Sequence, residues 1–215
     1  MKISAIIWDL DGVLIDSEPY HIEAEIETMG QYGIRLTHSI AKEYLGVKLE
    51  DYFTDIVSRF GVSIPAGEMI KKHYNTLIRY YKAVFPLTPH AVEVLKQLKG
   101  QYLMGIATSS EKNLARLALE RYSLLPYFKT VIYGEDVKFG KPNPEPFFTV
   151  SSRLKVDPGS VVVVEDSISG IRAGKKAGMY VIARKALHNN DLDFSSADFV
   201  VDDLREIPAL LKQLL

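Results

Sequence analysis

The sequence predicts a doubly wound α/β fold in which helices cover both faces of a parallel sheet and a helical domain is inserted near the start. From residue 100 onward, short runs of apolar and β-branched residues alternate with amphipathic helical patterns. Residues 17–84 interrupt this order, since their apolar positions recur at helical spacing without a clear strand pattern. The first apolar run stands before this interruption, so the helices are expected to form an insert.

The expected strands are apolar at successive positions, as in sheets that are buried on both faces. They are Ala5–Trp8, Leu103–Ala107, Thr130–Tyr133, Val161–Val164, Tyr180–Ala183 and Asp198–Val201. Strands of this kind, joined by helices, favour a Rossmann-like core.

The helices expected between the strands have capping and stop residues that indicate where they begin and end. We expect one to be capped by Thr88, with Pro89 in its first turn and Gly100 after its last. Ser110 is expected to open the next, which runs to about Tyr122. Asn143-Pro144 is expected to open a third, and Ser167 precedes a fourth that ends at Gly178.

The insert divides the chain into two expected domains. Residues 1–16 and 85–215 would form the core, and residues 17–84 a helical cap. The chain would cross between them near residues 14–18 and 82–88, which would act as a hinge. Tyr74 and Tyr81 fall on an apolar stripe and are expected to pack in the core of the cap.

Composition excludes several classes of protein. The chain has 215 residues, of which 47% are hydrophobic and 25% charged, and a net charge of -1. Such a chain can bury a large core and presents no bulk field that attracts nucleic acid or an anionic membrane. It has no cysteine, which rules out disulfides and thiolate metal sites. Without a signal-peptide pattern or a long apolar run, the expectation is a cytoplasmic protein.

Acidic residues follow two of the expected strands. Asp9 and Asp11 come directly after the first strand, with Gly12 suited to a sharp exit, and Glu165-Asp166 ends the Val161–Val164 run. The carboxyl ends of parallel strands meet at one edge of a sheet, where ligands bind. Each pair alone could be a helix-capping loop. Together, clustered carboxylates need a cation, and Mg²⁺ is the natural one.

Two further strand-end features suit an anionic ligand. Thr108, Ser109 and Ser110 precede a helix, so their hydroxyls and the helix-start amides could hold an anion. Lys141 lies in a loop stiffened by two prolines. A loop lysine is usually a solvated charge, but the constellation of carboxylates, hydroxyl and lysine is what phosphoryl transfer through an aspartyl-phosphate requires.

The chain resembles the haloacid-dehalogenase superfamily, in its phosphatase and β-phosphoglucomutase-like branch. The run Asp9–Glu18 is similar to the first motif of that family, Thr108 to the second, Lys141 within Val137–Glu145 to the third, and Val164–Gly170 to the fourth. The motifs occur in the family's order, and the expected helical insert occupies the position of the family's cap.

The resemblance implies a role for each matching residue. Asp9 would be the nucleophile and a Mg²⁺ ligand, and Asp11 the general acid and base, with its backbone carbonyl also on the metal. Thr108 and Lys141 would hold the phosphoryl oxygens. Asp166 would complete the metal site, with Glu165 as a ligand or beside one. The expected enzyme is a Mg²⁺-dependent phosphatase acting on a small phosphorylated metabolite, such as a sugar phosphate.

Other functions stay open. A sugar phosphomutase of this family would share His21, but its cap arginine would fall at Leu49, which cannot bind a phosphate, although the adjacent Lys48 could. A dehalogenase needs no metal site, so Asp11 and Asp166 argue against it. A non-catalytic phospholigand-binding protein could dispense with the reactive residues, none of which is missing here.

Contacts outside these motifs are less determined. Ser109, His21 and Lys48 are the expected contacts to the leaving group. The other histidines are expected to be surface or capping residues. A monomer is expected, because the cap would already cover the catalytic face.

Overall fold

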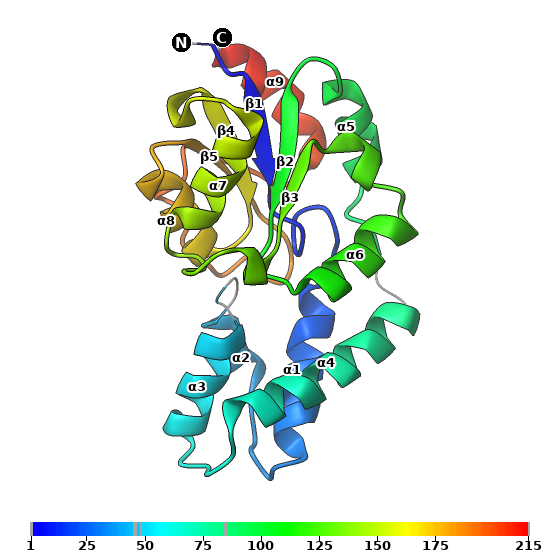
Figure 1. Cartoon of the computed structure of the whole chain (residues 1–215), viewed down its shortest axis with the longest axis vertical. Coiled ribbons are helices and arrows are strands. Elements are labelled where there is room, and N and C mark those ends of the chain that lie inside the picture. Colours follow the sequence, from blue (N-terminus) through cyan, green and yellow to red (C-terminus); the bar gives the residue numbers. More distant parts are fainter. Residues whose placement is uncertain (1, 45–46, 48, 84–85, 215) are drawn as a thin grey trace.

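In the computed structural model, which describes residues 2–44, 47, 49–83 and 86–214, six strands form one parallel sheet. Its order is β3-β2-β1-β4-β5-β6 (Figure 1). The strands are β1 (Ala5–Trp8), β2 (Leu103–Ala107), β3 (Thr130–Ile132), β4 (Val161–Glu165), β5 (Tyr180–Arg184) and β6 (Phe199–Val201). The predicted α/β fold class is confirmed.

Strand order places a crevice at the centre of the sheet. The chain builds β1, β2 and β3 in one direction and then returns to the other side of β1 to add β4, β5 and β6. Ile7 of β1 is in register with Gly105 of β2 and Val163 of β4. In such sheets, ligands bind beyond the carboxyl ends of the strands where the order reverses, which here is between β1 and β4.

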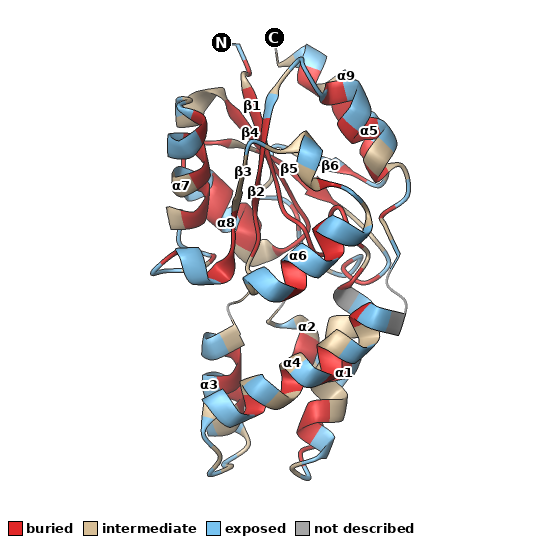
Figure 2. Ribbon diagram, turned by 45° about the vertical axis from the view of Figure 1, so that its right-hand side comes forward, coloured by how far each residue is buried: buried red, intermediate tan, exposed pale blue. Residues whose placement is uncertain are grey.

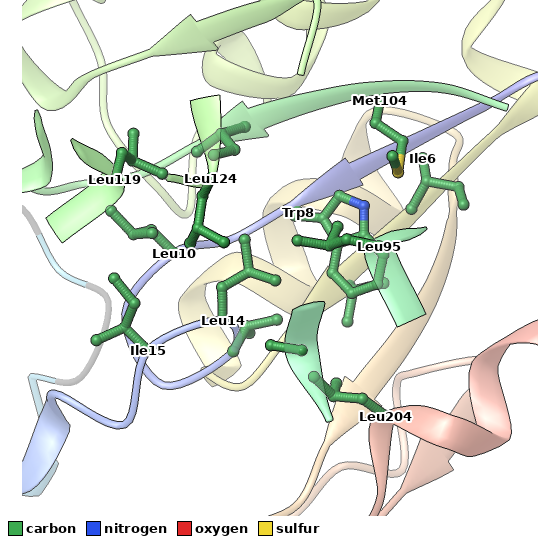
Figure 3. Close-up of a cluster of buried hydrophobic side chains, with 14 of the residues drawn as sticks. Ile6, Trp8, Leu10, Leu14, Ile15, Leu95, Met104, Leu119, Leu124 and Leu204 are labelled. Carbon is green, nitrogen blue, oxygen red and sulfur yellow. The ribbon is translucent and has the colours of Figure 1, made fainter. Parts of the chain in front are cut away.

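Helices cover both faces of the sheet because its strands are apolar on both sides. Ile6 and Trp8 face α5 (Ala91–Leu98), α6 (Lys112–Arg121) and α9 (Ile207–Gln213), and Figure 3 shows part of this cluster around Trp8. Ala5 and Ile7 face α7 (Glu145–Leu154) and α8 (Ile168–Lys176). The alternation along β1 is the period of two of a strand.

The helices of the insert lie beyond the carboxyl ends of the strands, whereas both chain termini lie at the opposite end (Figure 1). They are α1 (Glu18–Gly30), α2 (His38–Lys42), α3 (Leu49–Arg59) and α4 (Ala66–Ala83). Their buried sides face one another (Figure 2) around a core that includes Met29, Phe53, Ile56 and Met69. We call residues 18–83 the cap. Its separation as an independent domain stays a prediction.

The two segments that join the cap to the sheet run side by side. The Asp16 amide donates a hydrogen bond to the Pro86 carbonyl at 2.9 Å, and the Thr88 amide donates to the Leu14 carbonyl at 3.0 Å. Part of the second predicted hinge, residues 84–85, lies outside the described residues. The hinge therefore stays a prediction. Within the described helices, none is long and apolar enough to cross a membrane.

Two predicted helix starts are wrong. Thr88 does not cap α5, because His90 adopts a left-handed conformation with φ 64° and the helix begins only at Ala91. Ser110 does not open α6, which begins at Lys112 after Glu111. The Ser110 hydroxyl instead donates to Asp11, at 2.6 Å. The prediction for α8 holds at its start, where the Ser167 side chain accepts a hydrogen bond from the Gly170 amide.

Candidate active site

Asp9 leaves the end of β1 and enters the crevice between β1 and β4. Its amide donates to the Val164 carbonyl at 2.9 Å, so the backbone is still tied to β4 at this point. The chain then turns sharply at Gly12, whose φ of 76° a residue with a side chain would rarely adopt. A side chain there would also collide with Asp166. The Arg184 guanidinium donates to the Gly12 carbonyl and fixes the turn.

Lys141 forms ion pairs with carboxylates at the ends of both β1 and β4. Its ammonium nitrogen lies 2.5 Å from Asp9 Oδ1 and 2.5 Å from Glu165 Oε1, and its side chain is only 2% exposed. Burial alone would lower the pKa of Lys141, but the two carboxylates raise it above its ordinary value. The lysine therefore stays charged beside Asp9.

Glu165 is fully engaged by the protein. One carboxylate oxygen meets Lys141, and the other accepts hydrogen bonds from the amides of Asp166 and Ser167, each at 3.0 Å, and from the Ser167 hydroxyl at 2.9 Å. Its remaining side is closed by Gly170 in α8, where a Cβ atom would collide with the carboxylate. This saturated geometry favours holding Lys141 in place over direct metal binding.

Gly170→Ala is therefore expected to displace the Glu165 carboxylate and to lower the free energy of unfolding by about 1–3 kcal/mol. Chemical denaturation without added metal measures the change. Gly67→Ala on α4 is the matched control, because a Cβ atom there meets nothing within 4 Å and alanine favours a helix. Equal stability of Gly170→Ala and the unsubstituted protein would contradict the close packing around Glu165.

Asp11 is buried among hydroxyl groups. Its Oδ1 accepts from the hydroxyls of Ser17, at 2.6 Å, and Tyr81, at 2.8 Å, and lies 3.4 Å from His21 Nε2. Its Oδ2 accepts from Ser110 at 2.6 Å and from Thr108 at 3.3 Å. Burial favours the neutral acid, but His21 and these hydroxyls hold the pKa of Asp11 well below its ordinary value.

Asp166 is held from the loop that follows β5. His188 Nε2 lies 2.8 Å from Asp166 Oδ2, and the Asn189 side-chain amide donates to the Asp166 carbonyl at 2.9 Å. Burial raises the pKa of Asp166, and the charge of Glu165 adds to this while His188 opposes it. Asp9 is similar: burial raises its pKa well above the ordinary value, Lys141 opposes this, and Glu165 and Asp166 add to it.

The crevice fits a Mg²⁺ ion with few protein ligands. Among the described residues, no three His, Asp or Glu side chains stand together as a complete metal cage. The Asp11 carboxylate faces hydroxyls, and both oxygens of Glu165 are engaged. Lys141 meets Oδ1 of Asp9 and His188 meets Oδ2 of Asp166, which leaves the second oxygen of each carboxylate as a donor for the ion. Magnesium is usually held by one or two carboxylates and keeps several waters. The mutual repulsion of Asp9 and Asp166 also favours a bound cation.

The structure brings most of the predicted residues to one pocket between the sheet and the cap. Its lining includes Asp9, Asp11, His21, Thr108, Ser109, Lys141, Glu165 and Asp166. Lys48 lies outside the described residues, so that prediction is not tested. Leu49, the position that the resemblance aligns with the cap arginine of a mutase, lines the pocket with an apolar side chain.

The sequence of this chain matches, over residues 6–184, the family described as haloacid dehalogenase-like hydrolase. The chain belongs to the haloacid dehalogenase-like hydrolases. The resemblance drawn from the motifs and the expectation of a hydrolytic enzyme of this family are thereby confirmed.

Similar proteins cover this hydrolase along most of its length. A phosphorylated carbohydrates phosphatase of Thermotoga maritima is 32% identical over 178 residues, 82% of each chain. Hexitol phosphatase B of Escherichia coli is 29% identical over 212 residues, 97% of this chain and 96% of the relative. The crystal structure of a β-phosphoglucomutase from Clostridium difficile superposes with a TM-score of 0.86 at 22% identity, covering 99% and 98% of the two chains, and shows the shared fold.

Sequence reasoning missed several residues that shape this hydrolase site. Tyr81 is buried as predicted, but it packs in the core cluster of the sheet rather than in the core of the cap, and its hydroxyl donates to Asp11. The prediction that the other histidines are surface or capping residues is wrong for His188, which binds Asp166, and for His73, which is fully buried in the cap. His188 follows β5, so the strand-end argument could have found it. No signal in the sequence places Tyr81 beside Asp11.

Proposed function

We propose that this hydrolase is a Mg²⁺-dependent phosphatase that hydrolyses a small phosphorylated metabolite, a sugar or polyol phosphate, through an aspartyl-phosphate on Asp9. The observation that carries the proposal is the buried Lys141 ammonium, held 2.5 Å from Asp9 in a crevice that also contains Asp166. A carboxylate beside a fixed cation can receive a phosphoryl group, because the cation offsets the repulsion between two anions. The named activities of the relatives agree with this reading.

In the first step, an Asp9 carboxylate oxygen forms a bond to phosphorus while the bond from phosphorus to the leaving oxygen breaks. Lys141 binds phosphoryl oxygens, and Thr108 and the neighbouring amides lie where they can do the same. Asp11 gives a proton to the leaving oxygen. A Mg²⁺ ion held by Asp9, Asp166 and the Asp11 backbone carbonyl would supply further charge neutralisation at the phosphoryl group.

In the second step, Asp11 accepts a proton from water as the water oxygen bonds to phosphorus and the bond to Asp9 breaks. Inorganic phosphate leaves, and both carboxyl groups return to their starting states. In the structure, the contacts to Ser17, Tyr81 and His21 keep Asp11 ionised. For its acid role, the Asp11 carboxyl has to take up a proton from solvent and exchange these partners for the leaving oxygen before the first step, a change that cap movement at the hinge would allow.

The test is phosphate release from a panel of sugar, polyol and small aliphatic phosphates, with Mg²⁺ and with excess chelator. The expected result is release that requires Mg²⁺ and favours some members of the panel. The panel includes β-glucose 1-phosphate with a trace of glucose 1,6-bisphosphate. Glucose 6-phosphate formed without phosphate release would replace the proposal with the mutase. Binding of phosphate esters without turnover would favour a non-catalytic binding protein.

A further inference from the structure

Glu25 lies on the pocket wall but has no part in the steps above. It follows His21 by one turn of α1, and residues four apart lie on the same helix face. Both residues line the pocket that contains Asp9 and Asp11. Two other acidic residues of α1 behave differently: exposed Glu23 pairs with His38, and Glu27 pairs with Arg79.

The Glu25 carboxyl has an unused polar atom. Its Oε2 is shielded from solvent, and among the described residues it meets no hydrogen-bond partner. The Tyr52 hydroxyl of α3 lies beside this carboxyl and acts on it as a hydrogen-bond donor, although the two groups do not meet in full hydrogen-bond geometry. Buried polar groups are nearly always paired, because an unpaired one costs about 1–3 kcal/mol. The Glu25 side chain is only partly buried and lines the pocket, so its carboxyl can take a hydroxyl of a bound ligand as a further partner.

On this basis, and resting on the proposed phosphatase function, we propose that Glu25 is a specificity residue that hydrogen-bonds a hydroxyl of the leaving group and selects neutral, hydroxyl-rich phosphate esters over esters that carry a second anionic group.

The chemistry of the carboxyl supports a hydroxyl as its partner. Burial raises the pKa of Glu25 to about 8, although the Tyr52 hydroxyl opposes this, so the group is mostly a neutral acid near pH 7. A neutral carboxyl both donates and accepts hydrogen bonds, as a sugar or polyol hydroxyl does. Ala41, Val47 and Leu49 add apolar wall to the same pocket, suited to the C–H faces of such a molecule.

Within the described part of this pocket wall, a second phosphate or carboxylate on the substrate would meet no matching charge. Among the described residues that line the pocket, Lys141 alone is a lysine or arginine, and it is bound to Asp9 and Glu165. A dianionic group beside Glu25 would favour keeping that carboxyl protonated and would still lack a cation. The described lining of the pocket therefore disfavours esters with a second anionic group and also favours esters with hydroxyl groups.

The test compares kcat/KM for three substrates in Glu25→Leu and Glu25→Gln. The substrates are sorbitol 6-phosphate, which is rich in hydroxyls; p-nitrophenyl phosphate, which has none; and fructose 1,6-bisphosphate, which has a second phosphate. In Glu25→Leu, the ratio of sorbitol 6-phosphate to p-nitrophenyl phosphate is expected to fall ~10-fold or more, the loss of one buried hydrogen bond. Glu25→Gln keeps a donor and an acceptor and is expected to retain most of the ratio.

Glu23→Leu, on the exposed side of α1, is the matched control and should leave the ratio unchanged. Glu25→Ala replaces Glu25→Leu if the leucine variant fails to fold. An equal loss on both monophosphates, with the ratio kept, would assign Glu25 a structural role and overturn the inference. A preference of the unsubstituted protein for the bisphosphate would overturn it as well. If the unsubstituted protein releases phosphate from none of the three, the proposed function falls first and this inference falls with it.

Discussion

Asp9→Asn is expected to lower the rate of phosphate release by ~10⁴-fold or more while the protein remains folded, since loss of a nucleophile removes the covalent route as a whole. An amide cannot accept the phosphoryl group, although it fills the same space beside Lys141. Phosphate release under saturating substrate and Mg²⁺ measures the loss.

The fold of Asp9→Asn should survive for an electrostatic reason. Burial and the charges of Glu165 and Asp166 raise the pKa of Asp9 in the folded protein, although Lys141 opposes this. The protein therefore loses stability as the pH rises from the pKa of Asp9 in the unfolded chain through its higher pKa in the folded protein, where Asp9 ionises. A neutral amide avoids that loss, and Lys141 keeps Glu165 as its carboxylate partner, so the melting temperature at pH 7 without Mg²⁺ should be no lower than before. Asp202→Asn, at an exposed position after β6, is the control for the substitution itself. Retained turnover in folded Asp9→Asn would exclude Asp9 as the nucleophile.

Lys141→Met is expected to damage both stability and activity. The methionine fills the space of the stem but leaves Asp9 and Glu165 as neighbouring buried carboxylates without their shared cation. Removing one partner of a buried ion pair costs about 3–5 kcal/mol of unfolding free energy. Urea denaturation without metal measures this cost, and the phosphate-release assay measures the loss of activity in the fraction that folds.

A second substitution separates the two effects. In Lys141→Met with Glu165→Gln, one of the uncompensated charges is gone, so we expect a substantial part of the lost stability to return. Activity should stay low, because the phosphoryl group still lacks its lysine. Recovery of activity in the double variant would contradict a direct role for Lys141 and would leave it only as the partner of Glu165.

The sheet could be predicted from sequence because each strand is a short, continuous apolar run with no competing pattern. Val161–Val164 and Leu103–Ala107 admit few other structures, and both are strands in the sheet. Helix starts were less predictable, because several residues near each could serve as a cap. Thr88 and Ser110 are good caps in isolation, but the left-handed turn at His90 and the bond from Ser110 to Asp11 depend on the folded surroundings.

The candidate site was predictable to the extent that it lies at strand ends. Asp9, Thr108 and Asp166 each follow a buried strand directly, so the parallel sheet places them at one pocket independently of the loop conformations. Tyr81 and Glu25 come from cap helices, and their approach to the pocket depends on how the cap packs against the sheet. No local pattern carries that information. The saturated bonding of Glu165 is equally invisible in the sequence, where it reads as one more candidate metal ligand.

The proposed mechanism requires a phosphoryl group on Asp9, and trapping this intermediate is its most direct test. Asp11→Asn should form the aspartyl-phosphate from p-nitrophenyl phosphate, whose leaving group needs no proton, but should be slow to hydrolyse it because the water lacks its base. After acid quench, mass spectrometry of the peptide that contains Asp9 should show one added phosphoryl group, accompanied by a burst of p-nitrophenol of about one per chain. Steady release of p-nitrophenol without a covalent phosphate, or a phosphate on any other side chain, would contradict the account.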